Sequence, residues 1–230
     1  FQTSTESRQK KRAFSRFLFS FLHMIGFYNY TVILTYLSAL SAAVGITFTL
    51  HGNGFVALLC LMFSGVCDMF DGLVARTRER SAQEKRFGIW IDSLSDTVAF
   101  GVLPAAIGYA FGMRSFLYIF ILAVYVLAAI IRLAYYGVTE EERQAETTAA
   151  RTSFLGLPVT SSALIFPLLY CFKGLLGSTY FTPVYALFMA LTALAFVLRI
   201  KVKKCMLGGM LVMLAVGIVI FITLVVLKTR

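Results

Sequence analysis

Seven apolar runs, each long enough to cross or nearly cross a bilayer, constrain this chain more than any other feature. They lie at residues 30–50, 54–76, 88–112, 115–136, 155–173, 179–199 and 205–227. A membrane-spanning helix needs about 20 predominantly apolar residues. The chain is 59% hydrophobic and 14% charged, with a mean hydropathy of +0.83, whereas soluble proteins are about 45–50% apolar and about 25% charged. The sequence therefore predicts an all-α integral membrane protein.

The first 29 residues differ from the rest. Five basic residues precede or enter an aromatic-rich stretch that also contains His23: Arg8, Lys10, Lys11, Arg12 and Arg16. This pattern is typical of an amphipathic helix that lies in the membrane interface. We therefore expect a cytoplasmic basic tail with an interfacial helix at 1–29, followed by a polytopic transmembrane domain at 30–230.

The net charge of +10 could indicate a nucleic-acid-binding protein, but its distribution argues against one. The basic residues cluster at the ends of the apolar runs. If the runs alternate in direction, sixteen Lys and Arg fall on the side of the N-terminus and four on the other. Cytoplasmic loops carry such an excess. We expect a multi-pass protein of a prokaryotic cell membrane, with lipids rather than nucleic acid as partners, whose N-terminus and 77–87 link face the cytoplasm. The acidic run 140–142 is expected to be a solvated loop.

All the aspartates of the chain lie on either side of this link. Asp68 and Asp71 are three residues apart, and Asp92 and Asp96 are four apart. Each spacing places two carboxylates on one face of a helix. Because the link is short, the second and third runs should form an antiparallel hairpin whose carboxylates meet near the cytoplasmic boundary. Burying four unpaired carboxylates would cost several kcal/mol each, so the pattern predicts two divalent cations, Mg²⁺ or Mn²⁺.

Small residues accompany the aspartates. Gly72, Ala75 and Gly88 leave room for a ligand close to the helix backbones, and Arg76 suits a phosphate or a nucleotide. An ion-coupled transporter would also explain carboxylates inside a membrane. Transporters, however, commonly contain internal repeats and binding sites near the midplane. The sequence contains no evident repeat, and the aspartates lie near one boundary, which favours an enzyme.

One motif in this region resembles the signature of the CDP-alcohol phosphatidyltransferases. It reads Asp68-x2-Asp71-Gly72-x2-Ala75-Arg76, then eleven residues, then Gly88-x3-Asp92-x3-Asp96. The resemblance implies a six-helix catalytic core, beyond which the run at 205–227 would be a seventh transmembrane helix. It also implies a homodimer, and transfer of a phosphatidyl group from a CDP-linked lipid to an alcohol with release of CMP.

The resemblance further implies roles for individual residues. Asp68, Asp71 and Asp92 would hold the metals, while Asp96 would complete the second metal site and act as the general base. The residues expected to bind the CDP-linked donor are Gly72, Ala75, Arg76, Gly88, Asn29, Thr31 and Ser81.

Two further stretches indicate which alcohol is the acceptor. DSLSDTVAFGVLPA and SFLGLPVTSSALIFPL resemble the phosphatidylserine synthase branch, so we expect CDP-diacylglycerol and L-serine as substrates. Inositol phosphate and glycerol 3-phosphate are the alternatives. Candidate acceptor-binding residues are Arg132, Arg151, Thr160 and Ser161. Arg132 could instead extend to the membrane interface, and Thr160 and Ser161 could bond to carbonyls freed by a Gly156-Leu157-Pro158 turn.

Overall fold

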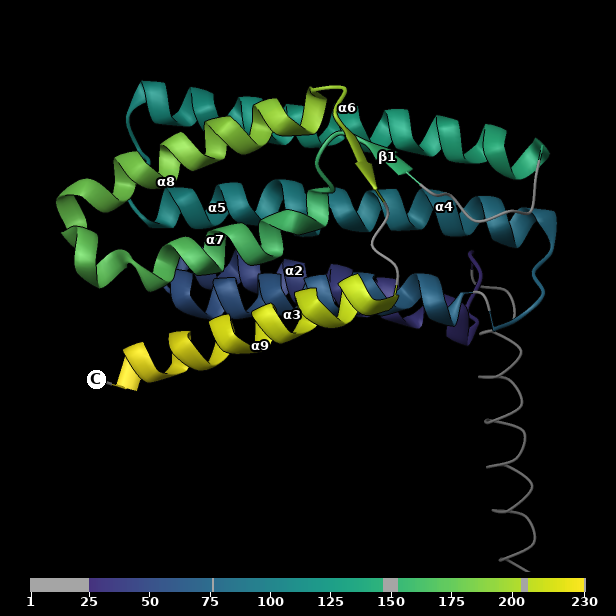
Figure 1. Ribbon diagram of the computed structural model, residues 1–230, viewed down its shortest axis with the longest axis horizontal. Helices are drawn as coiled ribbons and strands as arrows, with labels where there is room; N and C mark the ends of the chain where they lie inside the picture. The colour runs from purple at the N-terminus through teal and green to yellow at the C-terminus, as the bar shows by residue number, and fades with distance from the viewer. Residues whose placement is uncertain (1–24, 76, 147–152, 204–206, 230) are drawn as a thin grey trace, which may run out of the picture.

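The computed structural model describes residues 25–75, 77–146, 153–203 and 207–229, with the backbone alone at 144–146, 153–155, 178, 201–203 and 207 (Figure 1). Within these ranges the regular secondary structure is helical apart from two short strands. The elements, in order, are η1 (Tyr30–Val32), α2 (Ile33–Leu50), α3 (Gly54–Val74), α4 (Ala82–Asp96), η2 (Thr97–Val102), α5 (Leu103–Ala110), α6 (Phe116–Glu146), β1 (Ser153–Leu155), η3 (Val159–Ser161), α7 (Ser162–Cys171), α8 (Lys173–Val197), β2 (Lys201–Lys203) and α9 (Leu207–Thr229).

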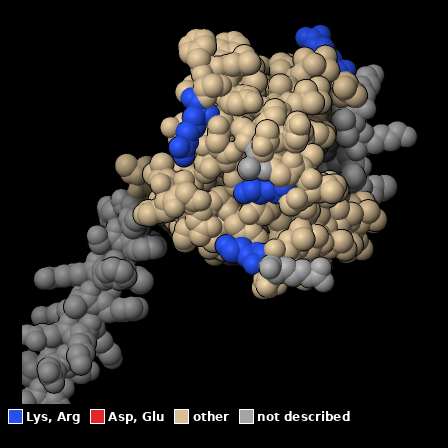
Figure 2. Space-filling view, turned by 90° about the vertical axis from the view of Figure 1, so that its left-hand side faces the viewer, with Lys and Arg blue, Asp and Glu red and all other residues tan. Residues whose placement is uncertain are grey.

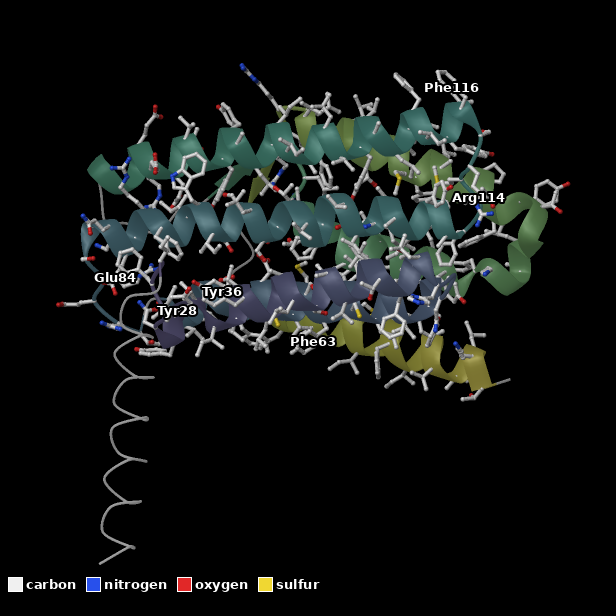
Figure 3. The ribbon with its side chains drawn as sticks, turned by 180° about the vertical axis from the view of Figure 1, so that it is seen from behind. Tyr28, Tyr36, Phe63, Glu84, Arg114 and Phe116 are labelled. Atoms are coloured by element: carbon white, nitrogen blue, oxygen red, sulfur yellow. The ribbon has the colours of Figure 1, made fainter. Side chains whose placement is uncertain are left out.

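Five helical segments in the described part of the chain are long and apolar enough to cross a membrane. They are Tyr30–Leu50, Gly54–Val74, Phe116–Arg143, Thr179–Val197 and Gly208–Thr229. Large apolar side chains point outward from them, as Phe63 does in Figure 3 with half of its surface exposed. Exposed apolar surface of this extent suits contact with lipid. The predicted all-α membrane protein is therefore confirmed.

The other two predicted runs are helical but are not single long helices. The run at 88–112 is divided among α4, the π-helical turn η2 and α5, which continue one another through the middle of the bundle (Figure 1). The run at 155–173 holds η3 and the ten-residue helix α7. Pro158 directly precedes η3, and Pro167 lies inside α7. Proline lacks a backbone N–H, which limits regular helix around it.

Hydrogen bonds across the α2–α3 interface hold these two helices together. Ser64 Oγ donates to the Ser38 carbonyl at 3.0 Å, and Ser41 Oγ donates to the Cys60 carbonyl at 3.1 Å. A Cβ atom on Gly45 would lie 2.9 Å from the Cβ of Cys60, so the two backbones approach closely there. Lipid-embedded helices associate through such small residues and interhelical hydrogen bonds, which contribute roughly 0.6–2 kcal/mol each.

Helix α6 extends beyond the bilayer-length segment and packs against α4. Glu141 accepts a hydrogen bond from Trp90 Nε1 at 2.9 Å. Glu140 is only 9% exposed, and its Oε1 lies 2.6 Å from Arg143 Nη2. The expectation that the acidic run 140–142 is a solvated loop was wrong, because the run lies within α6, where Glu141 bonds to α4 and Glu140 pairs with Arg143.

An antiparallel pair of strands joins two links that are far apart in the sequence. In this pair, β1 lies alongside β2 with Ser153 opposite Lys203. The contact continues into Gly156, whose N–H donates to the Ile200 carbonyl at 2.8 Å. Gly156 has φ +77°, and a Cβ there would lie 2.7 Å from the Phe196 carbonyl oxygen. Only glycine fits both constraints. The pair therefore ties the α6–α7 link to the α8–α9 link.

The two ends of the bundle differ in chemistry. Figure 3 shows Glu84 and Tyr28 at one end and Arg114 and Phe116 at the other. At the Arg114 end, the described atoms in Figure 2 include blue Lys and Arg and no red Asp or Glu. Here Lys173 Nζ lies 5.0 Å from the Phe111 ring centre. Such cation–aromatic pairs are typical of a membrane interface. The interfacial helix predicted within 1–29 lies largely outside the described residues.

Candidate active site

Aspartates from α3 and α4 meet in the structure. The two helices form the predicted antiparallel hairpin, with Asp68 and Asp71 in the last two turns of α3 and Asp92 and Asp96 in the last two turns of α4. Carboxylate oxygens of Asp68, Asp92 and Asp96 all lie within 4.8 Å of one another. Asp96 is buried, and the others are half-buried. The predicted convergence of carboxylates is found for these three.

Hydrogen bonds between carboxyl groups also join the two helices. Asp68 bonds to Asp96, and Asp71 bonds to Asp92. Two carboxyl groups so close together must share a proton or be neutralised by a cation. Asp71 also accepts a hydrogen bond from Thr35 of α2, at 3.3 Å between Oγ1 and Oδ2. Asp71 is therefore joined to the three clustered aspartates by its hydrogen bond to Asp92.

One carboxylate oxygen in this cluster indicates what is needed to complete it. Asp92 Oδ1 is buried and has no hydrogen-bond partner among the described residues. An unsatisfied buried acceptor is costly. A hard divalent cation accepts several close carboxylate oxygens as ligands and would satisfy it. The residues present thus fit a Mg²⁺ or Mn²⁺ ion.

Arg132 of α6 lies close to the cluster. It is only 9% exposed, and it is near enough to Asp68 for the two charges to interact. Whether Arg132 binds the acceptor or extends to the membrane interface stays a prediction. It supplies positive charge beside the aspartates, from a helix on which the sequence contains no other basic residue before Arg143.

The small residues have different surroundings. An added Cβ on Gly72 would meet nothing within 4 Å, so there is open space beside Asp71. A Cβ on Gly88 would lie 3.1 Å from Arg80 Nη1. The half-buried Arg80 therefore packs one turn before Asp92, a position that the sequence did not indicate. Ala75 forms the C-cap of α3 and is half-buried, and Arg76 lies outside the described residues.

Two residues predicted to bind the donor, Asn29 and Ser81, form helix N-caps, and a third, Thr31, bonds to one of them. Asn29 accepts hydrogen bonds from the backbone N–H and the hydroxyl of Thr31, and it donates from Nδ2 to Glu84 Oε1 at 3.0 Å. Ser81 and Glu84 form a reciprocal capping box at the start of α4. The backbone N–H of Ser81 lowers the pKa of Glu84, and Asn29 and Arg78 contribute to this shift. The donor contacts of Asn29, Thr31 and Ser81 stay predictions.

The candidate acceptor segment lies beside the end of α4. Its turn η3, which includes Thr160, packs against η2 and α3. Ser161 Oγ donates to the Pro158 carbonyl at 2.6 Å, which agrees with the alternative of a local turn bond at that residue. Arg151 lies outside the described residues. Thr35 and Arg80 are the site neighbours that the sequence interpretation missed, because neither belongs to the recognised motif.

Comparison with known proteins agrees with this geometry. A family model described as CDP-alcohol phosphatidyltransferase matches residues 28–228. The chain is 40% identical over 116 residues to a CDP-diacylglycerol–serine O-phosphatidyltransferase from Saccharomyces cerevisiae, covering 49% of this chain and 41% of the relative. It is 28% identical over 174 residues to a protein of the same name from Mycobacterium bovis, covering 74% and 59%.

A third relative is an archaetidylserine synthase from Methanothermobacter thermautotrophicus. It is 33% identical over 134 residues, which cover 57% of this chain and 53% of the relative. The chain thus spans about half the length of the curated relatives it matches. Because the relatives include yeast, bacterial and archaeal proteins, they do not separate the expected prokaryotic membrane from a eukaryotic one.

Proposed function

Since this chain belongs to the CDP-alcohol phosphatidyltransferase family, we propose that it transfers the phosphatidyl group of CDP-diacylglycerol to the hydroxyl of L-serine, with release of CMP. The observation that carries the proposal is the meeting of Asp68, Asp92 and Asp96 within 4.8 Å at the end of the α3–α4 hairpin. Relatives whose names specify serine support serine as the acceptor. Inositol phosphate and glycerol 3-phosphate are the alternatives that the experiment compares.

The aspartates would hold two divalent cations, Mg²⁺ or Mn²⁺. Asp68, Asp71 and Asp92 would be the main ligands, and Asp96 would complete the second site. Bound there, the cations would offset the charge of the diphosphate and of the departing CMP. The open space beside Gly72 and the position of Arg80 against Gly88 suit the cytidine diphosphate, which Arg76 and Ala75 would also contact.

In the reaction, the hydroxyl oxygen of serine forms a bond to the phosphorus that carries the diacylglycerol. The bond from that phosphorus to the CMP oxygen breaks, and CMP leaves with its electron pair. Asp96 accepts the hydroxyl proton, a role that needs a carboxylate within hydrogen-bond reach. Asp96 is 7% exposed, so its surroundings largely exclude water.

Arg132 would bind the carboxylate of serine. A guanidinium group presents a planar pair of donors that matches a carboxylate. Arg132 is buried and interacts electrostatically with Asp68, so it can hold the amino acid beside the general base. Thr160 and Ser161 lie on η3, which packs against η2, and could contact the same substrate.

We also expect the site to face the cytoplasm and the protein to form a homodimer. The cytoplasmic assignment follows from the positive charges of the α3–α4 hairpin, whose link and first turns of α4 contain Arg78, Arg80, Lys85 and Arg86. Accessibility of a cysteine placed at Glu79 to a membrane-impermeant reagent, in intact cells and in inverted vesicles, tests the orientation. Chemical crosslinking in native membranes tests the dimer.

The function is tested by supplying one alcohol at a time. The purified chain in lipid–detergent micelles receives CDP-diacylglycerol, Mn²⁺ or Mg²⁺, and either serine, inositol phosphate or glycerol 3-phosphate, and CMP release is measured. We expect CMP above the acceptor-free blank with serine, and none after chelation. CMP release with a different alcohol alone would reassign the acceptor, and undiminished release after chelation would contradict the metal mechanism.

A further inference from the structure

Thr35 of α2 makes hydrogen bonds to both helices that carry the aspartates. Its Oγ1 donates to Asp71 Oδ2 on α3 at 3.3 Å. Its backbone carbonyl accepts a hydrogen bond from Ser95 Oγ on α4 at 3.1 Å. Thr35 is 5% exposed and Ser95 is 4% exposed, so both contacts are shielded from solvent. One residue of a third helix therefore joins the two halves of the aspartate hairpin.

The direction of the Thr35 hydroxyl differs from that of other threonines in the same helix. Thr47 Oγ1 donates to the Val44 carbonyl at 2.7 Å, and Thr49 Oγ1 donates to the Ile46 carbonyl at 2.6 Å. Such bonds to a carbonyl in the preceding turn are the usual arrangement for threonine in an apolar helix. Thr35 instead donates to a carboxylate on another helix, so its contact depends on where it lies and not on its residue type.

Both contacts fall close to aspartates of the cluster. Asp71 itself accepts a hydrogen bond from the Thr35 hydroxyl, three residues before the end of α3 at Val74. Ser95 immediately precedes Asp96, the last residue of α4 before the π-helical turn η2. The contacts from α2 therefore act directly on the Asp71 side chain and on the residue next to Asp96.

We propose that Thr35 is a positioning residue that orients Asp71 and aligns α4, so that the four carboxylates bind a divalent cation. Hydrogen bonds from outside the ligand set commonly orient carboxylate ligands, and their loss weakens metal affinity about 10- to 100-fold. The inference builds on the metal site of the proposed function. It concerns the binding of Mn²⁺ alone, and it is independent of which alcohol is the acceptor.

The test measures Mn²⁺ binding without substrates. The full chain and its variants in detergent are titrated with Mn²⁺, and the free aqua ion is followed by its electron paramagnetic resonance signal. Thr35→Val keeps the shape of the side chain and removes the hydroxyl, and we expect it to weaken Mn²⁺ binding about 10- to 100-fold. Thr35→Ser restores a hydroxyl and should bind Mn²⁺ much more tightly than Thr35→Val. Ser95→Ala should weaken binding less than Thr35→Val, since the bond to Asp71 persists.

Thr49→Val is the matched control. Thr49 is buried on the same helix, but its hydroxyl bonds within α2, so this variant should bind Mn²⁺ like the unmodified chain. Equal Mn²⁺ affinity in Thr35→Val and the unmodified chain would overturn the proposal. Equal losses in Thr35→Ser and Thr35→Val, or no Mn²⁺ binding by the unmodified chain, would also overturn it. A different combination of results would separate the two proposals. If Thr35→Val binds Mn²⁺ more weakly, and the unmodified chain releases no CMP when serine is the acceptor, the role of Thr35 is supported and the acceptor assignment is rejected.

Discussion

Asn29, which precedes the first membrane helix, donates a hydrogen bond from Nδ2 to Oε1 of Glu84 in the first turn of α4, at 3.0 Å. The same carboxylate accepts the Ser81 backbone N–H at 2.9 Å and lies 3.8 Å from Arg78 Nη2. Glu84 thus joins the start of η1, the link after α3 and the start of α4. Because α4 carries two of the aspartates, this contact fixes one end of the helix that delivers them.

Glu84→Gln should lower the thermal stability of the protein at pH 7, because it removes the charge that these donors stabilise. The pKa of Glu84 is lowered in the folded protein, chiefly by the Ser81 N–H. Its stabilising contribution is therefore complete above the unfolded pKa of about 4.3 and is lost as pH falls through the folded pKa. Melting temperatures of the variant and the unmodified chain should therefore differ between pH 7 and pH 5 and should converge only below pH 4, as the pH falls through the lowered pKa.

Glu79→Gln is a control for this experiment. Glu79 is exposed in the same link and makes no hydrogen bond or ion pair with the described residues. Its melting temperature should match that of the unmodified chain at each pH. A difference between Glu84→Gln and the unmodified chain that stays constant well below pH 4 would contradict the charge argument.

Asp96→Asn should reduce CMP release by about 100-fold or more, since general-base catalysis contributes about 10²–10⁴-fold. Asn cannot accept the hydroxyl proton, although its carbonyl oxygen can still approach a cation. The initial rate at saturating serine and CDP-diacylglycerol is the measurement, with Mn²⁺ affinity determined in parallel. Full turnover in Asp96→Asn would remove the general-base assignment and leave the metal site in place.

Arg132→Lys should raise the KM for serine roughly 10- to 100-fold, because Lys keeps the charge but loses the paired donors of a guanidinium. The KM for CDP-diacylglycerol should change much less. Initial rates with each substrate varied in turn give the two constants, and Arg114→Lys at the opposite end of the bundle is the matched control. If both KM values rise equally while Mn²⁺ affinity falls, Arg132 acts on the aspartates and not on serine.

Gly156→Ala should destabilise the protein by about 1–2 kcal/mol from its left-handed backbone alone. The approach of the Phe196 carbonyl, 2.7 Å from the added Cβ, adds to this loss. Gly174→Ala is the matched control, because a Cβ there meets nothing within 4 Å. Apparent melting temperatures in detergent compare the two variants, and equal values would show that the 156–200 contact is not a constraint on the fold.

The helical framework could be predicted because apolar length is a direct requirement of the bilayer. Five predicted runs agree with long helices, and the aspartate spacing correctly indicated the α3–α4 hairpin. The β1–β2 pair could not be predicted, because it depends on the placement of links about 46 residues apart, which no local pattern encodes. The interruption of the third predicted run by η2 could not be predicted either, because no proline or glycine lies at the start of η2.

Part of the candidate site could be predicted from the sequence for a similar reason. The aspartates stand out from an apolar chain, whereas Thr35 lies in α2 among other hydroxyl residues and has nothing in its sequence surroundings to distinguish it. Arg132 was recognised because a charge inside an apolar helix is costly. Arg80 sits in a link with several basic residues, and only its contact with Gly88 sets it apart.

The β1–β2 pair also bears on the order in which the protein assembles during synthesis. Ser153–Leu155 leaves the ribosome well before Lys201–Lys203, and all of α8 lies between them. Because domains form progressively from the N-terminus, the aspartate hairpin can assemble early, while β1 must wait for its partner strand. The turn η3, which packs against η2 directly after Asp96, is connected to β1 through Gly156. The β1–β2 contact, and the tie it makes between the α6–α7 and α8–α9 links, can therefore form only after α8 has been inserted.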